Sequence, residues 1–445
     1  MGNYVYKERQ LKFVFYSLLG ITLIMTIYPF LVSVLGVHTG LYTPLKITKE
    51  VFLLATLLFL FVSIFFNPLL RHEDLKDKLN IAIAVYVALT LFFTIPTLQK
   101  NELEAAVSGF LMNTRFFIMF LTVQLILLLV SKDKVQKSLY KFIKYFLILS
   151  FLISIFAIMQ VTILPPSFLE FFGYNGVTTP PPYSTVDNNI NFLRAFSTMW
   201  APNMLGAFLL LPLAIFCTLF LQKHRVIYTG IGVVTTCIAI FVTHSRSAIF
   251  GAIICIGIIV IIKRKQFIFQ HIKPILIASA LAIAIGASTS TDSSVRMLIF
   301  HSSETDTSLT EGSTNDHFIA IKENSLDVLK HPLGQGVGTA GPSSFQQKKF
   351  TPKIAENYFI QILQEVGIIG FLIFCYISLV IGWRLIKITK KSNLAVALFA
   401  SFISINTINI FLHGWADDPT SITWWGFAAI VFFFPTILDF NNKDN

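Results

Sequence analysis

Charged residues are scarce in this chain of 445 residues, where Asp, Glu, Lys and Arg together make up 13%. A soluble domain of this length carries about a quarter charged residues, so a mainly soluble architecture is excluded. Instead, 55% of the residues are hydrophobic, and apolar runs long enough to cross a bilayer recur throughout. The sequence therefore predicts an all-α, polytopic helical membrane protein. We expect one integral membrane domain over residues 1–445 and no soluble domain.

Cysteine is rarer still, and its positions argue against both a disulfide framework and a zinc site. All four cysteines lie inside apolar runs: Cys217, Cys237, Cys255 and Cys375. A disulfide framework in an external loop is therefore not expected, and no Cys/His spacing typical of a zinc site occurs. The glycine cluster at 334–338 follows no predicted strand and has no Lys-Ser/Thr continuation, so it does not indicate nucleotide binding. We expect neither a metal nor a cofactor.

The apolar runs predict about twelve membrane-spanning helices. The first run, residues 11–36, is too long for a signal peptide and lacks a small-residue cleavage site, so we expect it to be retained. The predicted spans cover residues 12–35, 50–69, 80–97, 109–130, 142–164, 203–221, 226–243, 247–262, 272–290, 358–383, 393–412 and 421–438.

Basic residues alternate between the two ends of these spans. Most of the 34 Lys and Arg residues fall at the N-terminus, at the C-terminus and in every second connecting loop. Short basic loops are typical of the cytoplasmic side, so we predict that both termini are cytoplasmic. The net charge of +11 is then a topology signal and not evidence for a nucleic-acid partner. Two long polar loops, 165–202 and 291–355, are expected on the external side.

The second long loop contains one predicted helix. Residues 316–330 have apolar side chains at helical spacing. Ser313 and Asp316 have the spacing of a capping pair, so we expect the helix to begin at a Ser313 cap. Such an amphipathic helix could lie on the membrane face. The sequence His331-Pro-Leu-Gly-Gln-Gly-Val-Gly338 predicts a glycine-rich turn at its end.

Four arginines lie outside the basic loops and could bind substrate. Arg194, Arg246 and Arg296 each stand at or near the predicted external end of a span. A planar guanidinium can bind phosphate oxygens bidentately, which suits a diphosphate. The alternative is that each arginine extends to the lipid headgroups. Arg115 lies inside the span 109–130, where it could face a polar cavity, pair with an interior carboxylate or carbonyl, or extend to the headgroups in the same way.

Glu356 stands where the second long loop re-enters an apolar helix. An ionisable side chain at a membrane boundary costs free energy, which makes it a candidate functional residue. Partial burial would raise its pKa and suit it to act as a general base. The alternative is a carboxylate that faces the helix dipole, with Asn357 as the N-cap. Gln364 and Glu365 are expected to make structural polar contacts.

A short predicted external loop carries three further ionisable residues, His413, Asp417 and Asp418. They could contact sugar hydroxyls or a cation. The favoured interpretation is that they are simply solvated.

Four motifs, in order along residues 190–370, resemble those of the O-antigen ligase and Wzy-type polymerase superfamily. Arg194 followed by Pro202-Asn203 is similar to an arginine and a "PN" entry into a span. Thr243-His-Ser-Arg246 is similar to an "SR" turn, and Pro332–Gly338 is similar to a "PLxGxG" loop. Glu356-Asn357, nine residues and then Gly367-x-x-Gly370 matches an "HN-x9-GxxG" pattern at every position but the first.

The resemblance implies a GT-C-like bundle that transfers glycans from undecaprenyl-diphosphate-linked oligosaccharides at the outer face of a bacterial cytoplasmic membrane. It implies an extracytoplasmic active site and a chain-length regulator as a possible partner. The implied catalytic residues are Glu356, Arg246 and Arg194. The implied substrate-binding residues are Arg296, Asn357, Arg115, Asn203 and His317. The absence of Asp and Glu from loop 36–49 agrees with a metal-independent reaction.

Two departures from the family pattern bear on the reaction. Ligases of the family carry His where this chain has Glu356, whereas similar chain polymerases carry Glu. The chain therefore more closely resembles a polymerase of O-antigen, capsule or exopolysaccharide. An arginine usual before the amphipathic helix is replaced around Asp316-His317, which makes Arg296 the candidate substitute and leaves the acceptor open.

Three alternatives remain at this point. A ligase would transfer finished glycan to a lipid acceptor, and a relative of the family would transfer it to a protein. A lipid-linked glycan transporter or flippase is less favoured. Transporters tend to have repeated halves and ionisable residues at the bilayer midplane, whereas the halves of this chain look unalike and its candidate residues lie at the external boundary.

Overall fold

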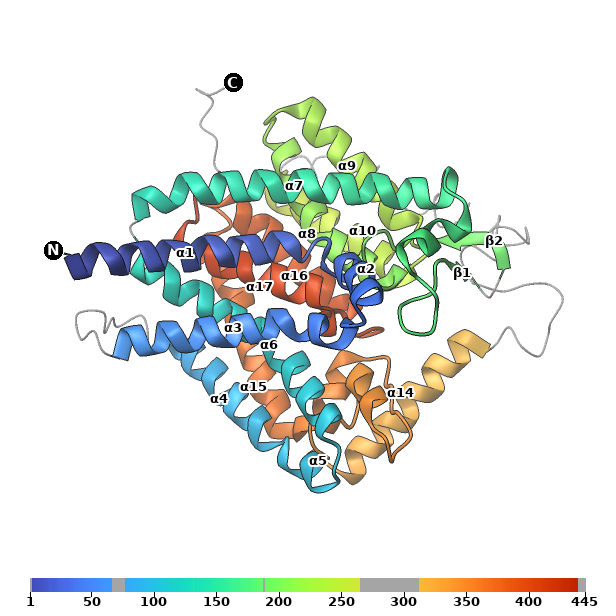
Figure 1. Ribbon diagram of the computed structural model, residues 1–445. Helices are drawn as coiled ribbons and strands as arrows, with labels where there is room; N and C mark the ends of the chain where they lie inside the picture. The colour runs from blue at the N-terminus through green and yellow to red at the C-terminus, as the bar shows by residue number, and fades with distance from the viewer. Residues whose placement is uncertain (1, 66–76, 131, 187–188, 265–311, 439–445) are drawn as a thin grey trace.

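The computed structural model describes residues 2–65, 77–130, 132–186, 189–264 and 312–438. In this part the chain is a bundle of helices with one two-stranded hairpin (Figure 1), which confirms the all-α class. The α-helices are α1 (Gly2–Ile24), α2 (Tyr28–Thr39), α3 (Tyr42–Phe65), α4 (Lys78–Phe92), α5 (Ile95–Gln99), α6 (Leu103–Leu129), α7 (Lys132–Thr162), α8 (Pro202–Leu221), α9 (Val226–Phe241), α10 (Arg246–Lys263), α14 (Gly312–Lys330), α15 (Tyr358–Ile388), α16 (Asn393–Ile408) and α17 (Asp418–Phe433).

Among the described residues, six helices are long and apolar enough to cross a membrane. A seventh span results if α1 and α2, which are bent by 86° against each other, count as one. Every predicted span that falls in this part overlaps at least one helix, but the span 12–35 covers both α1 and α2 and the span 80–97 covers both α4 and α5. The predicted span 272–290 lies outside the described residues. The protein is a multi-pass membrane protein. Helices α9, α16 and α17 have only 16 residues each, so the total of twelve spans stays a prediction.

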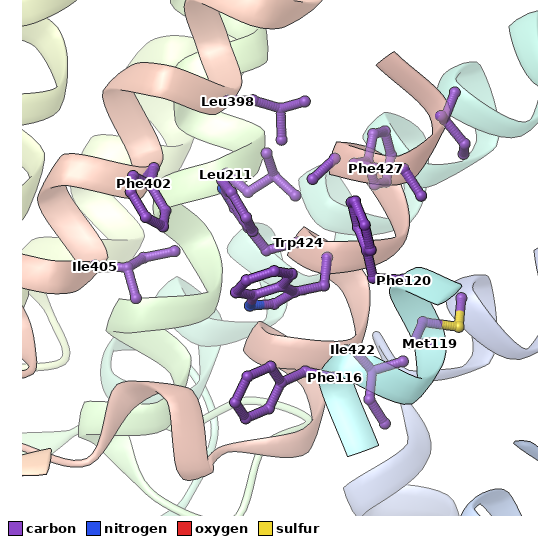
Figure 2. Packing of buried hydrophobic residues seen from close by; sticks show 14 of the residues in the cluster. Phe116, Met119, Phe120, Leu211, Leu398, Phe402, Ile405, Ile422, Trp424 and Phe427 are labelled. Atoms are coloured by element: carbon purple, nitrogen blue, oxygen red, sulfur yellow. The ribbon is translucent and has the colours of Figure 1, made fainter. Parts of the chain in front are cut away.

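Aromatic rings fill the centre of the bundle, where α6, α8, α16 and α17 meet (Figure 2). The ring of Trp424 stacks on Phe402 with 5.0 Å between centroids and meets Trp415 edge to face at 5.3 Å. The indole Nε1 of Trp424 donates to the hydroxyl of Ser401 at 3.0 Å, so its polar atom has a partner in the apolar interior. The core therefore holds together helices from both halves of the sequence.

The first long loop is more ordered than the sequence indicates. It contains the 3₁₀ helix η3 (Pro166–Phe172) and the antiparallel strands β1 (Ser184–Val186) and β2 (Asn189–Arg194). Arg194 is the last residue of β2 and pairs with Ser184. Figure 1 shows the hairpin, α2 and α14 toward one end of the bundle, with the start of α1 at the other. The hairpin was not predicted, because prolines and asparagines obscure the alternation expected of strands.

Helix α15 is broken at Gly367, which has the backbone angles φ 66° and ψ −173°. The break leaves helical carbonyls and an amide without partners in an apolar environment, where every backbone polar group needs one. Residues 332–338, which we call the glycine loop, supply them. The amides of Gln335 and Gly336 donate to the carbonyls of Gln364 (2.7 Å) and Glu365 (3.1 Å), and the amide of Ile368 donates to the Pro332 carbonyl at 2.9 Å.

Glycine is required at this junction because the backbones approach too closely for a side chain. A Cβ atom on Gly367 would lie 2.4 Å from the carbonyl carbon of Leu333, and one on Gly338 would lie 2.1 Å from the carbonyl oxygen of Ala105 in α6. Gly338 and Gly367 also have positive φ angles, 85° and 66°. The PLxGxG and GxxG motifs are therefore explained by packing of the loop into the broken helix.

Helix α14 confirms the predicted amphipathic helix but not its predicted start. The helix already includes Gly312, so Ser313 lies inside it and its expected role as N-cap is wrong. Its apolar residues Ile319 (45% exposed), Leu326 (48%) and Leu329 (76%) point away from the bundle. Such an outward apolar stripe agrees with the predicted position on a membrane face.

We expect Gly367→Ala to destabilise the protein strongly. The left-handed backbone costs a non-glycine residue about 1–3 kcal/mol, and the clash with Leu333 adds to that. The matched control is Gly257→Ala in α10, where a Cβ atom meets nothing within 4 Å. The apparent melting temperature of the purified protein in detergent is the measurement. Equal melting of the two variants would contradict the close packing of the glycine loop.

Candidate functional site

Arg194 lies against the turn that joins α9 to α10. Its Nε atom donates to the carbonyl of Thr243 at 3.0 Å, and its terminal nitrogen donates to Oδ1 of Asn203 at 2.9 Å. The next residue, Ala195, donates its amide to the Val242 carbonyl at 2.9 Å. The arginine, the PN entry of α8 and the Ser-Arg turn therefore form one structural unit, which their separation in sequence did not reveal.

The Ser-Arg turn is tight and positively charged. His244 has φ 50°, and the amide of Ser245 donates to Oγ1 of Thr243 at 3.1 Å. Burial lowers the pKa of His244, and the nearby charge of Arg194 lowers it further. His244 is therefore neutral at pH 7, and the positive charge of this turn comes from the arginines.

Arg246 is the first residue of α10 and is exposed. It makes no hydrogen bond or ion pair with any residue that the structure describes. The side chain of Ser245 does not cap the helix, so the first amides of α10 remain open to an external acceptor. A helix N-terminus of this kind favours an anion, and the guanidinium adds a planar pair of donors. This end of α10 can bind a phosphate group.

Glu356 and Asn357 form the junction between the second long loop and α15. Asn357 caps the helix, because its Oδ1 accepts from the amides of Phe359 (2.9 Å) and Ile360 (3.0 Å). This confirms the predicted cap. Glu356 is half-buried and has φ 49°, a conformation that costs a residue other than glycine about 1–3 kcal/mol. Strain of this size is typical of functional positions.

Helix α16 connects the junction to the arginine end of α10. The side chain of Asn357 donates to the carbonyl of Ile410 at 2.9 Å, and the amide of Tyr358 donates to the Asn409 carbonyl at 2.9 Å. One residue earlier, Ile408 contacts α10 at Gly251, where a Cβ atom would lie 3.2 Å away. Gly251 is about 7.5 Å along the helix from the first residue of α10. The glutamate junction and the arginine turn therefore lie at the same end of the bundle.

Arg115 belongs to a buried group of charges that we call the ion cluster: Lys49, Glu50, Arg115 and Asp418. Lys49 Nζ lies 2.8 Å from Glu50 and 2.7 Å from Asp418. Arg115 pairs with Asp418 and lies 3.4 Å from Glu50. All four side chains are at most 7% exposed. Of the interpretations for Arg115, pairing with an interior carboxylate is therefore confirmed and extension to the headgroups is wrong.

The ion cluster also fixes the segment that supports the glutamate junction. Arg115 donates to the carbonyl of Ala416 in the 3₁₀ helix η5 (Gly414–Ala416). The amide of Trp415 in the same helix donates to Oδ1 of Asn409 at 3.1 Å. The predicted solvation of Asp418 is wrong, because this residue is 4% exposed and holds both cations of the cluster.

The two other ionisable residues of this loop are uncharged at pH 7. Burial lowers the pKa of His413 to about 4. Burial and the nearby Asp418 raise the pKa of Asp417 to about 8. The charge of the loop at pH 7 is therefore that of Asp418 alone, which the ion cluster balances.

Glu365 is fully buried and joins three parts of the chain. Its Oε1 accepts from the amide of Gly338 at 2.7 Å, and its Oε2 accepts from Nδ2 of Asn113 in α6 at 2.5 Å. Gln364 donates to Asn324 (2.8 Å) in α14. These contacts confirm the expected structural role of Gln364 and Glu365. Asn113 escaped prediction, because an asparagine inside an apolar span has no local signal that names its partner.

Two candidate residues cannot be placed in the site. Arg296 lies outside the described residues. His317 is described only as a residue of α14. Within the described part of the chain, no group of His, Cys, Asp and Glu residues could hold a metal ion.

The chain is similar to one known family and to one known protein. Residues 231–375 match the family Wzy_C, O-antigen ligase. The chain is also 25% identical over 354 residues to an O-antigen polymerase of Salmonella muenchen, which covers 78% of this chain and 84% of that protein. Residues 231–375 are a Wzy_C O-antigen ligase domain. The chain is a distant homologue of an O-antigen polymerase, and the resemblance predicted from the four motifs is confirmed.

The Wzy_C domain contains most of the candidate site. It includes the Arg246 turn, the glycine loop, the Glu356 junction and the break at Gly367. Arg194 and Asn203 precede it, and the contacts of Arg194 with Thr243 bring them to it. The ion cluster lies entirely outside the domain in sequence, on α3, α6 and α17.

We expect Asp418→Asn to destabilise the fold by about 3–5 kcal/mol, because it leaves Glu50 as the one carboxylate beside two buried cations. Asp77→Asn is the control, since its pair with Arg384 is partly exposed and exposed pairs contribute about 0–1 kcal/mol. Denaturant or thermal unfolding in detergent would compare them. If both variants lose equally little stability, the ion cluster does not hold η5 in place.

Proposed function

We propose that this protein polymerises undecaprenyl-diphosphate-linked oligosaccharide repeat units into a surface polysaccharide, which could be O-antigen, capsule or exopolysaccharide. The observation that carries the proposal is that two residues lie at the same end of the bundle: Glu356, which is strained and half-buried, and Arg246, which is exposed at a helix N-terminus. The homology to an O-antigen polymerase and the glutamate at the family's histidine position support a polymerase.

The arginine end of α10 binds the diphosphate of the donor in this proposal. Arg246 and the open amides of α10 contact the phosphate oxygens, and Arg194, held by Asn203, adds a second positive charge. These groups stabilise the negative charge that develops on the leaving diphosphate. Arg296 and His317 complete the predicted substrate-binding set, whereas Arg115 acts at a distance through the ion cluster.

Glu356 acts as the general base. It accepts the proton of an acceptor sugar hydroxyl, and the hydroxyl oxygen forms a bond to the anomeric carbon of the donor. The bond from that carbon to the diphosphate breaks, and its electron pair leaves with the diphosphate, which inverts the anomeric centre. Asn357 positions Glu356 by capping α15. The glycosyl diphosphate bond supplies the driving force, so no nucleotide is needed.

We further propose a GT-C-like, twelve-span arrangement in the cytoplasmic membrane of a bacterium, with both termini cytoplasmic. The alternation of basic loops supports this topology. The exposed apolar stripe of α14 supports a reaction at headgroup depth, where a lipid-anchored diphosphate lies. A chain-length regulator would then contact the protein from the external side.

A ligase is the second candidate, and the Wzy_C O-antigen ligase match favours it. In a ligase the same arginines and glutamate would transfer a finished glycan to a lipid or protein acceptor. The two reactions differ in the acceptor, which must itself be a lipid-linked repeat in a polymerase.

We expect purified protein given only lipid-linked repeat units to form a ladder of products, and Glu356→Gln to abolish it. The amide keeps the size of the side chain but accepts no proton. Glu104→Gln is the matched control, because Glu104 forms an exposed ion pair with Lys348. Gel analysis of labelled glycan is the measurement.

Two results would overturn these assignments. Wild-type ladders from Glu356→Gln would exclude the general-base role. The absence of any ladder from wild-type protein, together with transfer to an added lipid or protein acceptor, would identify a ligase.

We expect Arg246→Lys to reduce turnover by about 10- to 100-fold, because lysine keeps the charge but loses the bidentate fork. The apparent KM for the lipid-linked donor should rise as well. Arg264→Lys at the other end of α10 is the control, since its guanidinium is exposed and donates to a backbone carbonyl. Unchanged kinetics in Arg246→Lys would argue against diphosphate binding at this helix end.

A further inference from the structure

Two cavities lie along the first half of α7, which Figure 1 shows at the end of the bundle away from the β1–β2 hairpin. One cavity, of about 380 Å³, lies between α7, the end of α8 and the start of α9, and its walls are mostly apolar. A second cavity, of about 690 Å³, lies beside the first turns of α7. Tyr140 and Lys144 line both cavities, so the two cavities are neighbours, and we call them together the groove.

The two parts of the groove have different chemistry. Lys137, Lys141 and Lys144 surround the second cavity and are exposed. None of them forms an ion pair with a carboxylate in the described part of the chain, and no Asp or Glu is among the described residues that line either cavity. Arg225 lines the first cavity and contributes to lowering the pKa of His224, after burial. Among the side chains that the structure describes, the positive charge around the groove therefore has no carboxylate beside it.

The dimensions of the groove match those of one membrane leaflet. Its apolar wall on α7 runs from Ile143 to Phe151, which is about 12 Å along a helix. Half of the hydrocarbon thickness of a bilayer is about 15 Å. Lys137 and Lys141 precede this apolar wall on α7, and Lys144 lies in its first turn. The lysines therefore stand at one end of the wall, as the phosphate of a lipid stands at one end of its acyl chains.

We propose that this groove binds an anionic phospholipid. The phosphate lies among Lys137, Lys141 and Lys144, and an acyl chain lies along α7 between α8 and α9. A basic pocket joined to an apolar groove between membrane helices selects an anionic headgroup over a neutral one. Arg194 lies in the segment that joins α7 to α8, and Asn203 is the second residue of α8. A lipid bound between these helices would therefore stabilise the helices that support the candidate site.

The test uses full-length protein in detergent, titrated with dioleoylphosphatidylglycerol or dioleoylphosphatidylcholine, with bound lipid counted by native mass spectrometry. We expect saturable binding of phosphatidylglycerol and weaker binding of phosphatidylcholine. Replacing Lys137, Lys141 and Lys144 with Gln should weaken phosphatidylglycerol binding by about 10- to 100-fold. Replacing Lys387, Lys390 and Lys391 with Gln removes the same charge elsewhere and should leave binding unchanged.

A second pair of variants tests the apolar part without changing any charge. Ile148 lines the groove, so Ile148→Trp should fill it and weaken binding. Leu152 is exposed one turn further along α7 but does not line the groove, so Leu152→Trp should have no effect. Each variant should be checked for wild-type melting before titration, because only folded protein is informative.

Three outcomes would overturn the proposal. Equal binding of the two phospholipids would exclude selection of the charge. Equal loss in both triple-lysine variants would mean general attraction to a basic surface. Stronger competition by a polyprenyl phosphate than by phosphatidylglycerol would assign the groove to the isoprenoid carrier.

Discussion

The break of α15 at Gly367 is the constraint on which the rest of the site depends. In a membrane bundle, each backbone amide and carbonyl needs a partner inside the protein, so a broken helix must be completed by another segment. The glycine loop completes it and is held against α6 by the close approach of Gly338. This anchors the end of the second long loop at the start of α15. Glu356 lies at this point with a positive φ angle. A loop that was not anchored would leave this strained backbone conformation.

Three arginines have different environments in this structure. Arg115 is paired inside the ion cluster, where it supports η5 and through it the contacts of Asn409 with the junction. Arg246 is exposed at the start of α10, where a ligand can reach it. Arg194 is intermediate, because two protein contacts orient its guanidinium beside the turn. Burying the paired charges of the ion cluster costs free energy, and the result of this burial is that the short loop containing η5 is held in place.

Local features of the site were predictable from the sequence, and features that depend on distant partners were not. The Asn357 cap and the helix over 316–330 follow from residue type and spacing within a few positions. The pairing of Arg115 with a carboxylate could be expected as one of several outcomes, but its partner Asp418 could not be named. The contact of Asn113 with Glu365 and the β1–β2 hairpin had no local signal. The order of four motifs was sufficient to predict the resemblance that the comparisons support, although each motif alone is weak.

The sequence by itself determined the membrane class, the helical periodicity and the positions of the motifs, because hydrophobic run length and residue spacing act locally along the chain. Only the tertiary structure decided which residues have a structural role. Gly334, Gly338 and Gly367 of these motifs prove to be sites of backbone contact, since a Cβ atom would collide there. Asp418 proves to be buried, since cations from α3 and α6 surround it. These distinctions depend on contacts between residues far apart in sequence, which spacing along the chain cannot encode.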